Sequence, residues 1–126
     1  MKNGRRLLAV LCVFAMVMAF ASITALAATN VTFNATFNSI GGSQSFHAQK
    51  SNTLNYATVN VTGYNASQSG SSVTISMATG TRTAYVTGVQ YGIQIPYSSR
   101  PIVGATGQMT VTASTGVVGV GGTWTP

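Results

Sequence analysis

Few side chains in this sequence could take part in catalysis, because it contains no aspartate and no glutamate. General acid–base pairs, two-carboxylate glycoside hydrolysis and oxygen-rich calcium sites all depend on these residues. The one histidine, His47, has no acid to orient it, so a serine-type triad is not expected. The one cysteine, Cys12, lies in the N-terminal apolar run, which argues against thiol catalysis and zinc–thiolate sites. The sequence therefore predicts a protein that is not an enzyme and that uses no cofactor.

A role in binding is still possible, and five residues are candidates for contact with a partner: His47, Lys50, Tyr97, Arg100 and Trp124. Tyr97 and Trp124, together with Tyr91, are aromatic side chains of the kind that lie flat against sugar rings. The alternative for the aromatic residues is structural, with Tyr91 in the core and Trp124 closing the edge of the fold.

Positive charge is sparse beyond the N-terminal segment. Three of the six Lys and Arg residues lie in that segment, which leaves only Lys50, Arg82 and Arg100. Nucleic-acid binding needs clustered basic residues that release several counterions, so nucleic acid is not an expected partner. His47 with Lys50, and Arg100 in a loop between two prolines, are instead candidates for contact with an anionic cell-wall polymer or a lipid headgroup.

The N-terminal segment, residues 1–27, has the pattern of a secretory signal peptide. A basic head precedes the apolar run at residues 7–21, and Ala25-Leu26-Ala27 supplies the small residues that a signal peptidase reads before Ala28. The alternative is a retained anchor, because the segment is close to the roughly 20 residues that cross a bilayer. We expect cleavage, with the membrane contacted only through this segment if it stays attached.

Cleavage leaves residues 28–126 as a single secreted domain of 99 residues. This part is rich in Thr, Ser, Asn, Gln and Gly and contains no cysteine, so no disulfide holds it. Packing and backbone hydrogen bonds must stabilise the fold by themselves. The expected location is extracellular or associated with the cell wall.

Alternation of apolar and polar residues predicts β-strands along most of this domain. Expected strands are residues 30–38, 44–49, 54–62, 73–77, 82–90, 91–95, 107–113 and 117–120. Gly88 indicates a bulge or bend, residues 63–72 a long polar connection, and Tyr91 shares a face with Ile93 and Ile95. No window has apolar residues at helical spacing. The predicted fold is a small antiparallel β-sandwich, or a partly open barrel, of about six to eight short strands.

Two short stretches give one resemblance to a known family. Phe46-His47, followed by Ala57-Thr58-Val59, resembles the aromatic/His and Ala-Thr-Val stretches of the lactococcin 972 bacteriocins, which are small secreted cysteine-free β-sandwiches. The resemblance covers about a tenth of the chain. It implies an antibacterial role as an alternative function.

Uncharged strands rich in Thr and Val lack the charged residues that usually keep sheet edges apart. We therefore expect a small secreted bacterial β protein that acts by binding or self-assembly, through edge-to-edge pairing or strand addition. The alternatives are the bacteriocin-like role and a carbohydrate or cell-wall binding module.

Overall fold

The computed structural model describes residues 30–37, 41–114 and 116–126. The predicted signal peptide and its cleavage residues, Ala25, Ala27 and Ala28, lie outside the described residues and stay a prediction. Eight strands make up the fold: β1 (Val31–Thr36), β2 (Ser43–Gln49), β3 (Tyr56–Ala66), β4 (Val73–Met77), β5 (Ala84–Val86), β6 (Gln90–Pro96), β7 (Thr106–Ala113) and β8 (Val117–Thr125). Across the described ranges there is no helix, and hence none that could cross a membrane.

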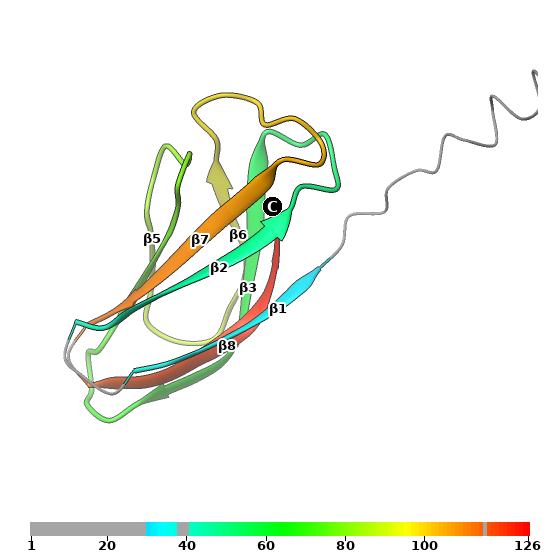
Figure 1. The fold of residues 1–126 in the computed structure, drawn as a ribbon. Helices are drawn as coiled ribbons and strands as arrows, with labels where there is room; N and C mark the ends of the chain where they lie inside the picture. Colours follow the sequence, from blue (N-terminus) through cyan, green and yellow to red (C-terminus); the bar gives the residue numbers. More distant parts are fainter. Residues whose placement is uncertain (1–29, 38–40, 115) are drawn as a thin grey trace, which may run out of the picture.

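The strands form two separate four-stranded sheets in which all neighbours are antiparallel (Figure 1). The first sheet has the order β1-β8-β3-β6, and the second has the order β2-β7-β4-β5. The predicted antiparallel sandwich is confirmed. Edge strands β1 and β2 contact each other on one side of the sandwich, and β5 and β6 contact each other on the other side.

The core lies between the sheets because one face of each strand carries the apolar residues. In β4 the three alternate residues Val73, Ile75 and Met77 are buried, and β7 does the same with Met109 and Val111. The predicted inward face of these strands is therefore confirmed. The outer faces carry mainly Ser, Thr, Asn and Gln, which face water without charge.

Tyr91 is the clearest departure from the predicted alternation. It is 67% exposed, whereas Ile93 and Ile95 are buried as expected. Two residues of β6, Tyr91 and Gly92, lie opposite the single residue Asn60 of β3, and Gly92 has a φ of 66°. A bulge with glycine in this left-handed conformation turns the preceding side chain outward. The prediction of Tyr91 as a core residue was wrong for this reason.

Strand lengths also differ from those predicted at β8, which runs to Thr125 beyond the predicted end at residue 120, and at two other places. Residues 63–66, expected in a polar connection, extend β3 because they pair with β8. The strand expected at residues 82–90 shrinks to β5, and Gly88 lies in the connection to β6 instead of forming a bulge. The last two differences come from the pairing partner available, which local sequence does not specify.

Candidate functional site

Four of the five predicted contact residues lie at one end of the sandwich, around Lys50. Lys50 is only 2% exposed; its Nζ donates a 2.9 Å hydrogen bond to Asn52 Oδ1 and lies 5.0 Å from the centre of the Tyr97 ring. Burial lowers the pKa of the Lys50 ammonium, and the nearby charge of Arg100 lowers it further. An amide oxygen and an aromatic face thus stabilise this cation in place of a carboxylate.

This lysine end contains a cavity of about 190 Å³, lined by Lys50, Thr79, Tyr97, Ser99, Pro101, Ala105, Thr106, Gly107 and Pro126. Asn52 connects Lys50 to Pro126, two of the residues that line the cavity. Its Oδ1 accepts from Lys50, and its Nδ2 donates a 2.9 Å hydrogen bond to the Pro126 carbonyl oxygen. Arg100 is exposed and donates from Nε and an Nη to the Thr53 carbonyl oxygen, at 3.1 and 2.9 Å. Its guanidinium therefore holds a neighbouring loop in place.

Two of the three aromatic candidates for sugar stacking are buried, whereas the third, Tyr91, is exposed. Trp124 is 0% exposed and Tyr97 is 6% exposed, so neither ring presents a face to solvent. Trp124 is a core residue, but it does not close an edge, because β8 lies between β1 and β3. Its indole Nε1 has no hydrogen-bond partner in the described part of the chain. Burial raises the pKa of the Tyr97 phenol. A sugar would have to bind elsewhere on the molecule.

His47 lies on the exposed outer face of β2, opposite Gln108 of β7. It also lines a shallow pocket of about 580 Å³ that reaches the lysine end, with Val31, Ala48, Gln49, Lys50, Ser51, Val103 and Gly104. No group of three His, Cys, Asp or Glu side chains capable of holding a metal occurs in the described residues.

The edge of the first sheet at β6 is closed by a segment that follows β4. Thr81 donates from its backbone N and its Oγ1 to the Pro96 carbonyl oxygen, at 2.8 and 3.2 Å. Arg82 donates from its guanidinium to the Gln94 carbonyl oxygen. Pro96 has no N–H to offer. The outward backbone groups at this end of β6 are thus almost all occupied or absent.

The edge of the second sheet at β2 has no such cover. At its ends, the Ala113 N–H donates to the Gly42 carbonyl at 2.9 Å and the Lys50 N–H donates to the Ala105 carbonyl at 2.9 Å. In an antiparallel strand, the backbone N–H and C=O groups of successive residues point alternately toward the neighbouring strand and away from it. Because Gly42 and Lys50 both face β7, the outward groups belong to every second residue from 43 to 49. These are Ser43, Ser45, His47 and Gln49.

Within the described ranges, the backbone groups of those four residues have no partner on the outward side. Beside them, Gln44 reaches from β2 across to the edge of β1, donating from Nε2 to the Thr36 carbonyl at 2.8 Å and accepting from the Thr36 N–H at 3.2 Å. We call the outward side of Ser43–Gln49 the β2 edge. The Gln44 amide closes one end of β1 but leaves the β2 edge open.

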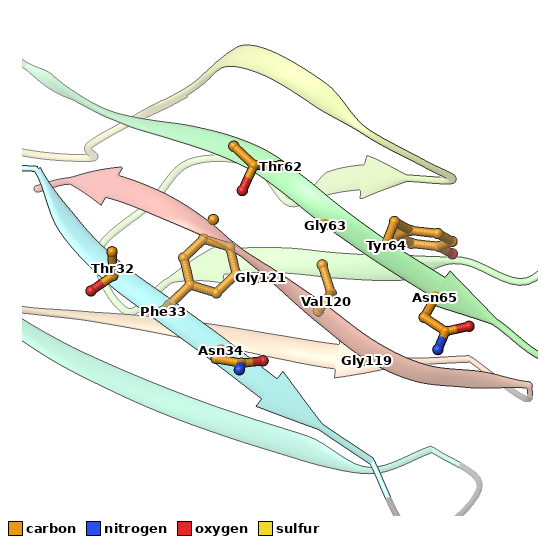
Figure 2. A pocket seen from close by; sticks show the side chains of 11 residues that line it. Thr32, Phe33, Asn34, Thr62, Gly63, Tyr64, Asn65, Gly119, Val120 and Gly121 are labelled. Carbon is orange, nitrogen blue, oxygen red and sulfur yellow. The ribbon is translucent and has the colours of Figure 1, made fainter.

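A groove of about 520 Å³ crosses the outer face of the first sheet, over β1, β8 and β3. Its lining comprises Thr32, Phe33, Asn34, Thr62, Gly63, Tyr64, Asn65, Gly119, Val120, Gly121 and Gly122, and we call it the glycine groove (Figure 2). None of its residues was a predicted site residue. The three glycines within four residues of a strand were the signal that could have pointed to it.

The structure thus brings His47, Lys50, Tyr97 and Arg100 to one end and offers two accessible features, the β2 edge and the glycine groove. The chain matches no protein-family model, and no curated protein or solved structure is significantly similar to it.

Proposed function

We propose that residues 28–126 form a secreted, non-enzymatic protein that associates with a second copy of itself by antiparallel pairing of the two β2 edges. The observation that carries this proposal is the row of outward backbone groups at Ser43, Ser45, His47 and Gln49, which have no partner among the described residues. An open edge strand is a template for pairing with another strand. Export and a place at the cell surface or outside the cell follow from the signal pattern of residues 1–27.

The spacing of these groups suits a two-fold arrangement. If Phe46 lies on the two-fold axis, Ser43 faces Gln49 of the other copy and Ser45 faces His47, so each outward residue meets another outward residue. This pairing places no two charges of the same sign opposite each other, because these four side chains include no Lys, Arg, Asp or Glu. The product is one continuous sheet of eight strands built from two four-stranded sheets.

The inner face of β2 also gains from this pairing. Phe46 is partly buried, with its ring centroid 5.6 Å from that of Phe33, and it packs against the core beside Ala48. A second copy across the edge would cover more of this ring. Burial of apolar area of this kind favours association.

Substitution of Ser45 by proline tests the proposal. The Ser45 N–H points outward, so proline at this position removes an edge donor without removing a bond to β7. The matched control is Gln94→Pro, which changes an outward-facing residue of the closed β6 edge. Sedimentation velocity of residues 28–126 over a dilution series should show dimers for the unmodified domain and for Gln94→Pro, and monomers for Ser45→Pro.

Folding of both variants is checked by circular dichroism. If proline unfolds either domain, Ser45→Lys and Gln94→Lys replace the pair, because one charge on each copy at the β2 edge also opposes pairing. A domain that stays monomeric at the highest concentration, or an Ser45 variant that is folded and dimerises as the unmodified domain does, would refute the proposal.

A further inference from the structure

The inward face of β2 leads to a charged residue. Phe46 and Ala48 are partly buried on this face and pack against the core, and Lys50, two residues further on, is only 2% exposed. Period-two alternation therefore aims the Lys50 side chain into the end of the sandwich, where the same face has so far carried apolar residues. A lysine at the margin of a core usually extends its ammonium into water, and this one does not.

The buried ammonium has no carboxylate side chain to pair with, because the sequence contains no Asp or Glu. An ammonium carries three N–H donors. One is given to Asn52 Oδ1 at 2.9 Å, and a second can point toward the Tyr97 ring, whose centre is 5.0 Å away. These two partners leave one donor over, and a buried charge that is not fully compensated is costly to the fold. Burial and Arg100 both lower the pKa of Lys50, and a negative charge beside it would act in the opposite direction.

The cavity of about 190 Å³ lies beside this ammonium, and we call it the lysine-end cavity. Tyr97 and Pro126 follow the last residues of β6 and β8 in the first sheet, and Thr106 and Gly107 begin β7 in the second. The Lys50 side chain faces the same space, because the Tyr97 ring that its Nζ approaches belongs to a residue of the lining. The cavity is thus bounded by both sheets and by a buried cation.

The rest of the lining is of two kinds. Three of its residues carry hydroxyl groups that can donate or accept, namely Thr79, Ser99 and Thr106. Three others are apolar, namely Pro101, Ala105 and Pro126. The lysine-end cavity therefore combines one cation, a few neutral polar groups and apolar walls.

These surroundings favour a small organic acid. A cation with a spare N–H donor favours an oxygen anion, and the lining contains no second charged residue that would suit a dianion. Apolar walls favour a ligand that carries carbon beside its charge, which inorganic phosphate and sulfate lack. The volume is below the range of about 300–1,000 Å³ that is usual for ligand pockets, so the acid must be short.

We propose that the lysine-end cavity binds the carboxylate of a short organic acid, with the Lys50 ammonium as its counter-ion. The carboxylate accepts a hydrogen bond from Nζ, and the carbon chain of the acid lies against the apolar walls. This site uses an inward-facing side chain, whereas the β2 edge consists of the outward backbone groups of Ser43–Gln49. The two proposals therefore stand or fall separately.

The test follows the signal of Lys50 itself. Lys50 is the only lysine of residues 28–126, so this domain prepared with ¹³C-labelled lysine gives a single Cε signal in an NMR spectrum. Sodium acetate, propionate and butyrate are added in turn, each against sodium chloride at equal ionic strength. Sodium phosphate and sodium sulfate form a second arm, which separates a carboxylate site from a site for any oxyanion. We expect a saturable shift with at least one carboxylate, no such shift with chloride, and weaker binding of phosphate and sulfate.

The bound carboxylate should also raise the pKa of Lys50, because a neighbouring negative charge stabilises the ammonium. The same Cε signal, followed through alkaline pH with and without the carboxylate, measures this change. Arg100, the other cation near Lys50, keeps its charge throughout this range. Screening by salt does not account for a difference between the two curves, since both are recorded at equal ionic strength.

Lys50→Met removes the ammonium and keeps an unbranched side chain. It should weaken carboxylate binding by about tenfold or more, the effect of losing one hydrogen bond to a charged group. Arg82→Gln is the matched control, because it removes another positive charge at the β6 edge, outside the lining of the cavity. The backbone amide signals of Ala105 and Gly107, which line the cavity, measure binding in every variant. Thermal melts check folding, and Ser45→Pro should bind as the unmodified domain does.

Three outcomes would overturn the proposal: no saturable shift with any carboxylate, tighter binding of phosphate or sulfate than of every carboxylate, and unchanged affinity in a folded Lys50→Met domain. If Lys50→Met does not fold, the pKa measurement on the unmodified domain decides in its place. A Lys50 pKa that the carboxylate leaves unchanged would then refute the site.

Discussion

The edge strands β2 and β6 each contain seven residues and each lie at the margin of a four-stranded sheet, yet one is open and the other is closed. At β6, Arg82 and Thr81 occupy the outward carbonyl oxygens of Gln94 and Pro96, and the proline lacks an N–H. At β2, the outward groups of four residues meet no described partner. In a domain with so few charges, an arginine is used to close one edge and none is used to close the other.

The contrast shows that low charge alone does not make an edge available for pairing. Both strands are neutral along their length. What separates them is a backbone segment, residues 79–82, that folds back onto β6 and has no counterpart at β2 within the described residues. Availability of an edge is thus a property of the neighbouring loops as much as of the strand.

Opening the β6 edge should have the largest effect. Arg82→Ala/Pro96→Thr frees the outward carbonyl of Gln94 and restores an outward N–H at position 96, while Thr81 still donates to the carbonyl at position 96. A protomer with a second, partly open edge can join a different neighbour there, so the dimer should extend into longer assemblies. Light scattering at increasing concentration should show a mass that keeps rising past that of the dimer.

The control for this experiment is Arg100→Ala/Pro101→Thr, which changes the same two residue types in the loop between β6 and β7. Arg100 binds the Thr53 carbonyl and not a strand edge. If both double variants keep the mass of the unmodified protein, the closed state of β6 does not depend on Arg82 and Pro96.

The lysine end should give an effect of intermediate size, and it tests whether the buried Lys50 cation, directly after the last residue of β2, influences stability alone. Because the pKa of Lys50 is lowered on folding, the unfolded chain binds more protons than the folded one just below the unfolded pKa of about 10.5. Stability should therefore rise with pH through this range, by at most about 1.4 kcal/mol per pH unit. Urea unfolding at several alkaline pH values measures the slope.

Lys50→Met should abolish this rise, while its state of association at neutral pH should match that of the unmodified domain. The raised pKa values of Tyr64 and Tyr97 act in the opposite direction above about pH 10, where the unfolded chain loses phenolic protons first and stability falls. A rise of equal slope in Lys50→Met would show that the lysine is not its cause.

The smallest expected effect concerns the Gln44 amide, which closes the end of β1 beside the open β2 edge. Gln44→Leu removes both bonds to Thr36, at the exposed margin of the sheet, and should lower the free energy of unfolding by about 0.5–1.5 kcal/mol. Gln49→Leu is the control, because that side chain is exposed on the same strand and forms no hydrogen bond to the described residues. Equal urea midpoints for the two variants would contradict the role given to Gln44.

Much of the fold could be predicted because period-two alternation fixes which side of a strand is apolar. β4 matches the predicted strand residue for residue, and the inward positions of β7 were identified as well. The prediction that Tyr91 is buried failed because one positive-φ glycine shifted the register, and no local sequence pattern indicated that shift. The predicted end of β3 was too early because the polar residues that extend the strand are held by pairing with β8 and not by their own propensity.

The candidate site was predicted less well than the fold. Four of the named residues do gather at one end, but Tyr97 and Trp124 are buried and Arg100 binds a loop carbonyl. The glycine groove went unnoticed because its walls are ordinary Thr and Asn residues on β1 and β3, which the pairing with β8 brings together only in the tertiary structure. Residue type identified the aromatic candidates, whereas exposure decided whether they could touch anything.

By itself, the sequence determined the absence of carboxylates in side chains, the position of the single cysteine within the predicted signal, and the alternating pattern that makes strands. These are properties of residue type and of neighbours one or two positions away. Only the tertiary structure decided which edges are covered, which aromatic rings are buried, and that bare stretches of β3 and β8 lie side by side. Such outcomes depend on contacts between residues far apart in the chain, for which the local pattern carries no information.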